Sequence, residues 1–101
     1  MLDAKMKTQL EAYLQNLKTP VELVAYLDGQ DKSRELETLM NEVSALSPLV
    51  SLVQGEDKEA RRPAMGVRSV ASGTEMRFAG VPLGHEFTSL VLAVLHSGGH
   101  P

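Results

Sequence analysis

The stretch that decides the fold runs from residue 21 to residue 53 and reads VELVAYLDGQDKSRELETLMNEVSALSPLVSLV. Its first seven residues are apolar at almost every position, which predicts a strand covered on both faces. A turn at residues 28–31 leads into a helix predicted over residues 33–45, and a short strand follows over 49–53. A strand, a helix and a strand in this order predict two parallel strands joined by a right-handed crossover.

A further helix is predicted before this unit. Asp3 can cap its first turn, and Thr19-Pro20 ends it because the residue before a proline is driven out of the helical region. The spacing places one apolar stripe along this helix, formed by Met6, Leu10, Tyr13, Leu14 and Leu17.

A hairpin and a last helix are predicted after the unit. Strands over residues 64–70 and 75–79 flank a turn, and the helix covers roughly residues 85–97. The element order predicts an α/β fold with a mixed four-stranded sheet flanked by helices on both faces. Residues 1–101 then form a single domain.

The composition excludes several classes of function. The chain has 101 residues, a net charge of -3 with interspersed signs, and no basic patch of the kind that binds nucleic acid. Its amino terminus lacks the apolar segment of a secretory signal, and its longest apolar run, residues 90–95, is too short to span a membrane. A cytoplasmic protein is expected. Because the chain has no cysteine, it cannot perform thiol–disulfide chemistry alone.

The last residues, 96–101, read as a helix stop followed by the start of a linker, because glycine and then proline come after the last apolar turn. We therefore expect this domain to be a fragment of a longer chain.

The last predicted helix is apolar on nearly all sides. Its core stripe consists of Phe87, Leu90, Val91, Val94 and Leu95. Leu92 and Ala93 lie on other sides of the helix, and a helix that is apolar all round is usually buried all round. One small sheet covers only one side, which leaves two alternatives. Either Leu92 is simply a partly exposed apolar residue, which is common, or the helix has a docking face for a second domain or chain, with Phe87 and Leu92 in it.

Six segments of the chain carry a resemblance to a known family: MLD at 1–3, MKTQL at 6–10, PVEL at 20–23, RFAG at 77–80, PLGHEFTSLVLA at 82–93 and GGHP at 98–101. Along nearly its whole length the chain resembles the F component of bacterial alkyl hydroperoxide reductase. The segment from 82 to 93 is the longest and most specific, and residues 54–74 are the least similar.

The resemblance implies a thioredoxin-like fold and a role in peroxide detoxification. Members of this family pass electrons from NADH through FAD to a dithiol in an amino-terminal domain, which reduces a partner peroxiredoxin. That domain is built from two thioredoxin-like folds, of which the first has lost its dithiol. This chain is similar to the first fold, so it is implied to be a non-catalytic module beside the dithiol-bearing fold. FAD and NADH then belong to the full-length protein, which is implied to form a homodimer, and not to this chain.

Four positions take their expected roles from the resemblance. Gly29 and Lys32 stand where the two cysteines of a dithiol would be, after the first core strand, and are vestigial. Pro63 stands where thioredoxin-like folds hold a cis-proline. Glu86, in the first turn of the last helix, is implied to assist proton transfer at the neighbouring dithiol; its alternative role is to complement the helix dipole.

The three histidines invite a metal site, but the sequence does not support one. His96 and His100 are four residues apart, yet Gly98-Gly99 interrupts the helix between them, and a metal needs a converging ligand set. We expect no metal and no cofactor in this chain.

Two other functions remain open from the residues. One is a stand-alone, cysteine-free thioredoxin-like module that binds proteins, which an open reading frame ending near Pro101 would favour. The other is a small enzyme with non-thiol chemistry, which requires a pocket with converging acids or histidines.

Overall fold

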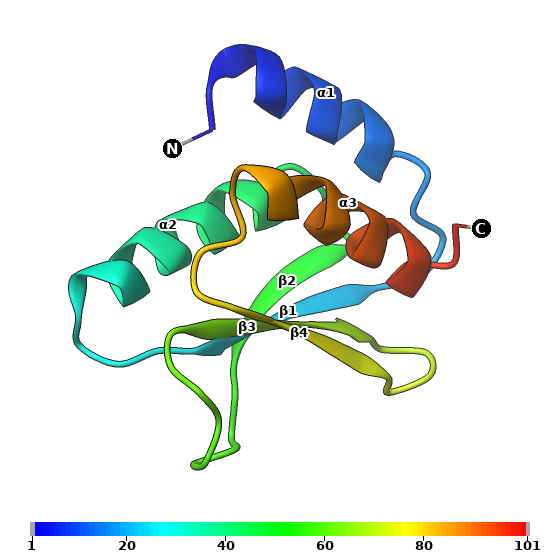
Figure 1. The fold of residues 1–101 in the computed structure, drawn as a ribbon. Coiled ribbons are helices and arrows are strands. Elements are labelled where there is room, and N and C mark those ends of the chain that lie inside the picture. Colours follow the sequence, from blue (N-terminus) through cyan, green and yellow to red (C-terminus); the bar gives the residue numbers. More distant parts are fainter. Residues whose placement is uncertain (1, 101) are drawn as a thin grey trace.

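A computed structural model describes residues 2–100 and contains three helices and four strands (Figure 1). In chain order these elements are α1 (Ala4–Leu14), β1 (Val21–Tyr26), α2 (Asp31–Ser44), β2 (Val50–Gln54), β3 (Ala64–Ser69), β4 (Glu75–Ala79) and α3 (His85–Ser97). The predicted order of elements is confirmed. Most of their bounds lie within two residues of the predicted ones; α1 ends earlier, at Leu14.

The four strands form one mixed sheet in the order β2-β1-β3-β4. β1 pairs in parallel with β2, with Val21 opposite Val50, as expected for a strand–helix–strand unit. β1 and β3 are antiparallel, and so are β3 and β4. The long apolar strand β1 therefore lies inside the sheet, where both of its neighbours satisfy its backbone.

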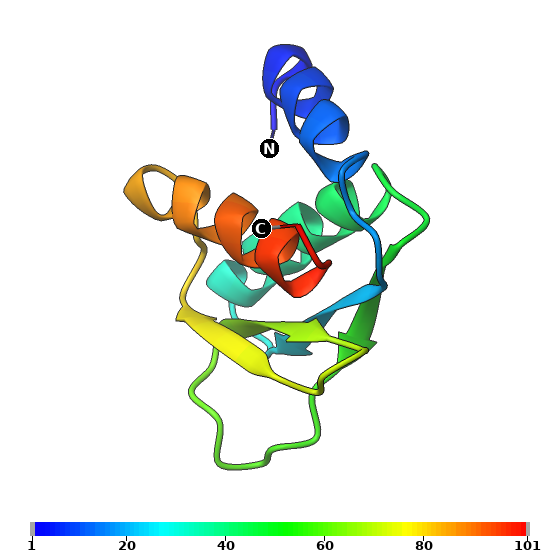
Figure 2. The same ribbon diagram turned by 90° about the vertical axis from the view of Figure 1, so that its right-hand side faces the viewer.

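All three helices lie on the same side of the sheet (Figures 1 and 2). α2 and α3 pack directly on the strands, and α1 lies over them as an outer layer. The main core fills the space between helices and sheet, and its fully enclosed side chains include Leu23, Leu36, Leu39, Met40, Met65, Val67 and Leu90.

The expectation of helices on both faces of the sheet is wrong, although the α/β class and the mixed sheet are confirmed. The second face carries a small cluster instead, formed by Val24, Tyr26 and Ala64 with Val53 and Ala60 packed against it. The loop of residues 55–63 lies under this face (Figure 1). β1 is covered on both faces as predicted, but a loop and a buried tyrosine replace the second helix layer.

Two side chains depart from the stripes expected from the sequence, which placed Tyr13 on the apolar stripe of the first helix and Ala93 off the core stripe of the last. Tyr13 is 54% exposed, because α1 contacts the layer beneath it mainly through Leu10 and Leu14. Ala93 is buried, because α3 turns that side towards the core and leaves Leu92 outermost. The predicted cap at Asp3 is confirmed, since its Oδ1 accepts a hydrogen bond of 2.7 Å from the amide of Met6.

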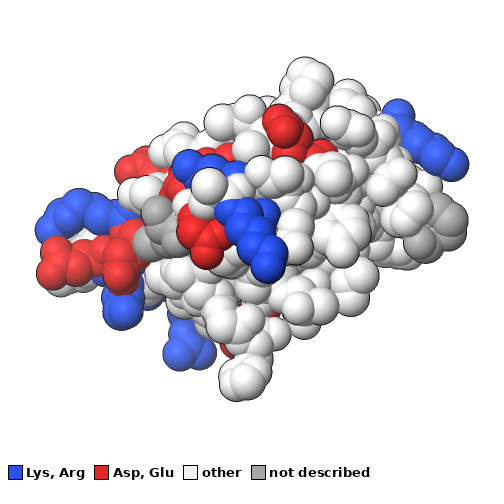
Figure 3. Space-filling view, turned by 90° about the horizontal axis from the view of Figure 1, so that it is seen from above, with Lys and Arg blue, Asp and Glu red and all other residues white. Residues whose placement is uncertain are grey.

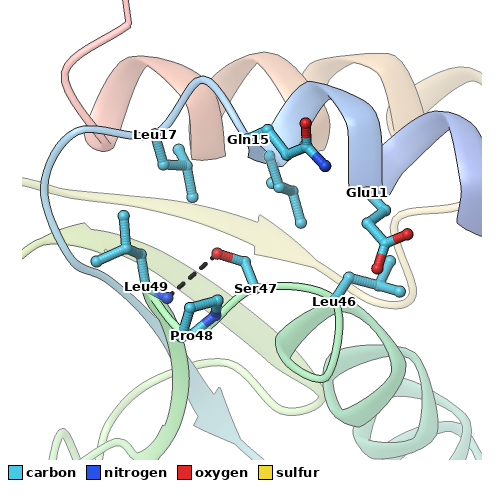
Figure 4. A pocket seen from close by; sticks show the side chains of 8 residues that line it. Glu11, Gln15, Leu17, Leu46, Ser47, Pro48 and Leu49 are labelled. Carbon is cyan, nitrogen blue, oxygen red and sulfur yellow. Dashed lines mark hydrogen bonds between the residues drawn. The ribbon is translucent and has the colours of Figure 1, made fainter.

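A cleft separates the end of α1 from the turn between α2 and β2 (Figure 4). Leucine side chains from both walls line it, and Glu11, Gln15 and Ser47 supply its polar groups. On the helix side of the sheet, Lys7 forms an ion pair of 3.3 Å with Glu42 of α2, which links α1 to the layer below. None of the helices formed by residues 2–100 is long and apolar enough to cross a membrane.

Candidate docking surface

The two positions predicted to replace a dithiol lie at the junction of β1 and α2. Gly29 and Lys32 are both exposed. The Lys32 ammonium pairs with Glu35 at 3.2 Å, and the carbonyl of Gly29 accepts a hydrogen bond from Arg34. Neither side chain supplies a thiolate, so this helix start performs no thiol chemistry.

A polar network at the end of β1 fixes the start of α2. The carboxylate of Asp28 accepts hydrogen bonds from the amide of Gln30 at 2.9 Å and from the hydroxyl of Ser33 at 2.8 Å. These two bonds hold the pKa of Asp28 below its usual range. Ser33 is buried, and its Oγ also accepts from the Asp28 amide at 2.9 Å. These hydrogen bonds fix the backbone where α2 begins, so the residues at this position have a structural role.

The peptide bond between Arg62 and Pro63 is cis, the conformation that the resemblance implied for this position. The Arg62 guanidinium donates to the carbonyl of Leu27 at 3.1 Å. This bond ties the loop before Pro63 to the end of β1.

Glu86 lies in the first turn of α3 and is exposed. Within residues 2–100 its carboxylate makes no hydrogen bond or ion pair. The preceding turn is shaped by Gly84, whose φ of 63° favours glycine. The side chain of Glu86 is therefore free to meet a group outside this chain.

An apolar groove runs between α1 and α3. Three adjoining hollows form it and share lining residues: Tyr13 lines all three, and Leu92 and Leu95 line two. The structure brings together the two predicted docking residues, because Phe87 and Leu92 line the same hollow. Phe87 is partly buried, whereas Leu92 is 60% exposed. We call this surface, centred on Tyr13, Phe87, Val91, Leu92 and Leu95, the α1–α3 groove.

Seen from the helix side, many of the charged side chains lie towards one end of the molecule, and others lie in the middle, at the upper edge and at the opposite end (Figure 3). A broad area in the lower right of this view carries no charged side chain. Apolar surfaces that lie together and are rimmed by polar residues mark interaction sites. The geometry of the groove therefore supports protein docking.

Sequence reasoning missed a charged network on the opposite face of the sheet. The Tyr26 hydroxyl donates a hydrogen bond of 2.7 Å to Glu75, and the Arg77 guanidinium lies 4.4 Å from the centre of the Tyr26 ring. Arg77 also pairs with Glu75 at 2.7 Å and with Asp57 at 3.0 Å. The alternation of Glu75 and Arg77 along β4 was the available signal, because it places both on one face.

This network shifts three pKa values. Burial raises the pKa of Tyr26, and its bond to Glu75 adds to that effect. Burial would raise the pKa of Glu75, but the bonds from Tyr26 and Arg77 outweigh it and the pKa is lowered. The hydrogen bond from Arg77 lowers the pKa of Asp57. The two carboxylates therefore stabilise the fold while they are ionised.

We expect Arg77→Met to remove most of the stability that the protein loses at low pH when Glu75 and Asp57 become protonated. A carboxyl group whose pKa is lowered by folding stabilises the protein above its unfolded pKa of about 4 and loses that effect as pH falls through the folded value. The melting temperatures of wild type and variant should differ most near neutral pH and converge below about pH 4. If the difference in melting temperature stayed constant across this pH range, the ionised carboxylates of the network would not be the source of the stability that Arg77 provides.

The described residues do not gather a set of metal ligands. Among residues 2–100, no group of three or more histidine, aspartate or glutamate side chains could hold a metal ion. The cleft beside α1 contains one titratable side chain, Glu11, and no second acid or histidine to work with it. Converging titratable groups are the mark of a catalytic pocket. His96 and His100 line one hollow of the α1–α3 groove together with Tyr13, and no aspartate or glutamate is among the described residues that line it.

Comparison with known proteins identifies relatives along the whole chain. The AhpF proteins of Escherichia coli and Pseudomonas putida, each named as the F component of alkyl hydroperoxide reductase, are 50% and 48% identical over 101 residues. The Staphylococcus aureus protein of that name is 46% identical over 99 residues. In each case the chain spans 19% of the length of the relative. No protein-family model matches the chain.

Solved structures agree with the sequence comparison. The NTD_N/C domain of the Enterococcus faecalis alkylhydroperoxide reductase AhpF superposes with a TM-score of 0.85 at 30% identity. The match covers 100% of this chain and 56% of that domain. A protein disulfide oxidoreductase from Aeropyrum pernix superposes with a TM-score of 0.76 at 23% identity, which shows the same fold. By sequence over its entire length and by fold, this chain is a thioredoxin-like homologue of one part of the alkyl hydroperoxide reductase component AhpF.

Proposed function

We propose that this chain is a non-catalytic module of an alkyl hydroperoxide reductase flavoprotein, and that it supports an adjacent dithiol-bearing thioredoxin-like fold. The observation that carries the proposal is the α1–α3 groove, an apolar surface of this fold that includes Leu92 at 60% exposure. A chain without cysteine contributes by contact and not by electron transfer.

The matched solved structures support the identity of the partner. This chain covers 56% of the Enterococcus faecalis domain and 50% of the Aeropyrum pernix chain, so each contains about as much again beyond the matched part. A second unit of similar size has the dimensions to cover the groove. Residues 1–101 then form the first unit. The linker expected from residue 96 starts later, because α3 continues to Ser97.

The remaining features of the full-length protein follow from the family. FAD and NADH bind outside this chain, electrons reach a peroxiredoxin through the dithiol of the second unit, and the whole protein is a cytoplasmic homodimer. In this arrangement Glu86, exposed and unpaired within residues 2–100, lies near the dithiol and assists its proton transfer.

The proposal is tested by titrating this chain into the isolated dithiol-bearing unit of a full-length relative in a calorimeter. We expect saturable binding with one site and a negative heat-capacity change, because apolar surface becomes buried. Sedimentation of each partner alone shows whether it is monomeric. Absence of binding between two folded monomers would contradict the proposal and favour a stand-alone module with another partner.

We expect Glu86→Gln to leave the melting temperature of this chain unchanged, because Glu86 is exposed and has no partner within residues 2–100. In the complex, the same change should shift the pH profile of dithiol reactivity, since a nearby carboxylate changes the thiol pKa. Glu56→Gln, an exposed change in the loop of residues 55–63 under the other face of the sheet, is the matched control. Identical pH profiles for the two variants would leave Glu86 as a charge at the helix end.

A further inference from the structure

The methionines that the structure describes differ sharply in exposure. Met40 and Met65 are enclosed by the core, with 0% and 1% of their surface exposed. Met6 is partly buried, whereas Met76 is 47% exposed. The chain has no cysteine, so methionine provides all its sulfur. The exposed thioether is the one that an oxidant in solution meets first.

Met76 lies on an outer strand of the sheet. It belongs to β4, which forms one edge, and it pairs with Val67 of β3. Its side chain lines a small hollow between the β3–β4 hairpin and the end of α3. A small oxidant therefore reaches the sulfur without any strand opening.

The hollow is rich in groups that can bind a sulfoxide oxygen. Its other lining residues are Ser69, Ser72, Thr74, His96 and Ser97. Ser69 Oγ accepts a hydrogen bond of 3.2 Å from the Ser72 amide, and Ser72 Oγ accepts one of 3.3 Å from the Thr74 amide. Both hydroxyls act as acceptors in these bonds, so each keeps its O–H to donate. A polar oxygen added to Met76 has donors on the walls of the hollow.

We propose that Met76 is a site of oxidation by hydroperoxides, and that its sulfoxide is accommodated without loss of the fold. A sulfur lone pair attacks the terminal oxygen of the hydroperoxide, and the O–O bond breaks. The transferred oxygen forms the sulfoxide, and its proton passes to the departing alkoxide, which leaves as an alcohol. Sulfur is oxidised by two electrons and the peroxide is reduced by two. This proposal goes beyond the docking role and does not depend on it.

The test exposes the folded chain to tert-butyl hydroperoxide, stops the reaction at intervals and measures oxygen addition at each methionine by peptide mass spectrometry. We expect Met76 to be oxidised about tenfold or more faster than Met40 and Met65, because those two are enclosed. The melting temperature of chains oxidised at Met76 alone should stay close to that of untreated protein.

Met76→Leu is the matched variant, because leucine keeps a similar volume without sulfur. It should lose the fast oxygen uptake while the slow rates at Met40 and Met65 persist. The proposal is overturned if either enclosed methionine is oxidised as fast as Met76. It is equally overturned if oxidation at Met76 unfolds the chain.

Discussion

Tyr26→Ala should lower the free energy of unfolding by about 3–5 kcal/mol, the range for removing a buried aromatic side chain. Tyr26 is 2% exposed and forms the centre of the cluster on the second face of the sheet. Its loss opens a cavity between β1 and the loop of residues 55–63, and it also deprives Glu75 of a hydrogen bond. The melting temperature should fall by roughly 15 °C or more in a domain of this size.

Tyr26→Phe is the matched control for this experiment. It keeps the ring under Arg77 and removes only the hydroxyl that donates to Glu75, so it should cost about 1 kcal/mol. Chemical denaturation of both variants separates packing from hydrogen bonding. If Tyr26→Ala cost no more than Tyr26→Phe, the second face would not hold a core of its own.

Leu92→Asp should weaken binding to the dithiol-bearing unit at least about tenfold, because it places a charge at the centre of an apolar contact. The same change should alter the stability of the isolated chain by no more than about 0.5 kcal/mol, since surface substitutions usually stay within that limit. Leu92 is 60% exposed, so its side chain carries little of the fold. Calorimetric titration gives the affinity, and thermal melting gives the stability.

Val70→Asp provides the control for Leu92→Asp. Val70 is also an exposed apolar residue, at 50%, but it follows β3 at the hairpin turn and lies outside the α1–α3 groove. We expect it to bind with wild-type affinity. Equal weakening by both changes would indicate a general effect of added negative charge and would remove Leu92 from the docking surface.

The sequence predicted the elements of this fold well because its hydrophobic patterns are unambiguous. Leu36, Leu39, Met40 and Val43 recur at helical spacing and are buried on α2 as predicted. Their pattern is local, so it can be read without knowledge of tertiary contacts.

What covers the second face of the sheet could not be read from the sequence. The apolar run through Val24 and Tyr26 indicated that β1 is covered on both faces, and a helix was the expected cover. The actual cover depends on Arg77 of β4 reaching Asp57, a pairing across 20 residues that no local pattern encodes. The outward position of Tyr13 has a similar origin, because the angle at which α1 crosses the layer below is set by tertiary packing.

The candidate site was predictable only in part. The pattern of α3 indicated a docking face with Phe87 and Leu92, and the structure places both in one hollow. The pattern of α3 gave no sign that α1 forms the other wall of the α1–α3 groove through Tyr13. A groove between two helices is a property of their relative placement, which periodicity within one helix does not contain.

The central claim is that this chain, without redox chemistry of its own, supports the dithiol-bearing unit of the reductase. The most direct measurement uses a full-length relative from which the matching residues have been removed, with this chain added in trans. NADH-dependent reduction of the partner peroxiredoxin is followed as the chain is titrated. The account predicts a rate that rises and saturates with wild-type chain and stays low with Leu92→Asp. A rate that does not respond to the chain, at concentrations where calorimetry shows complete binding, would contradict it.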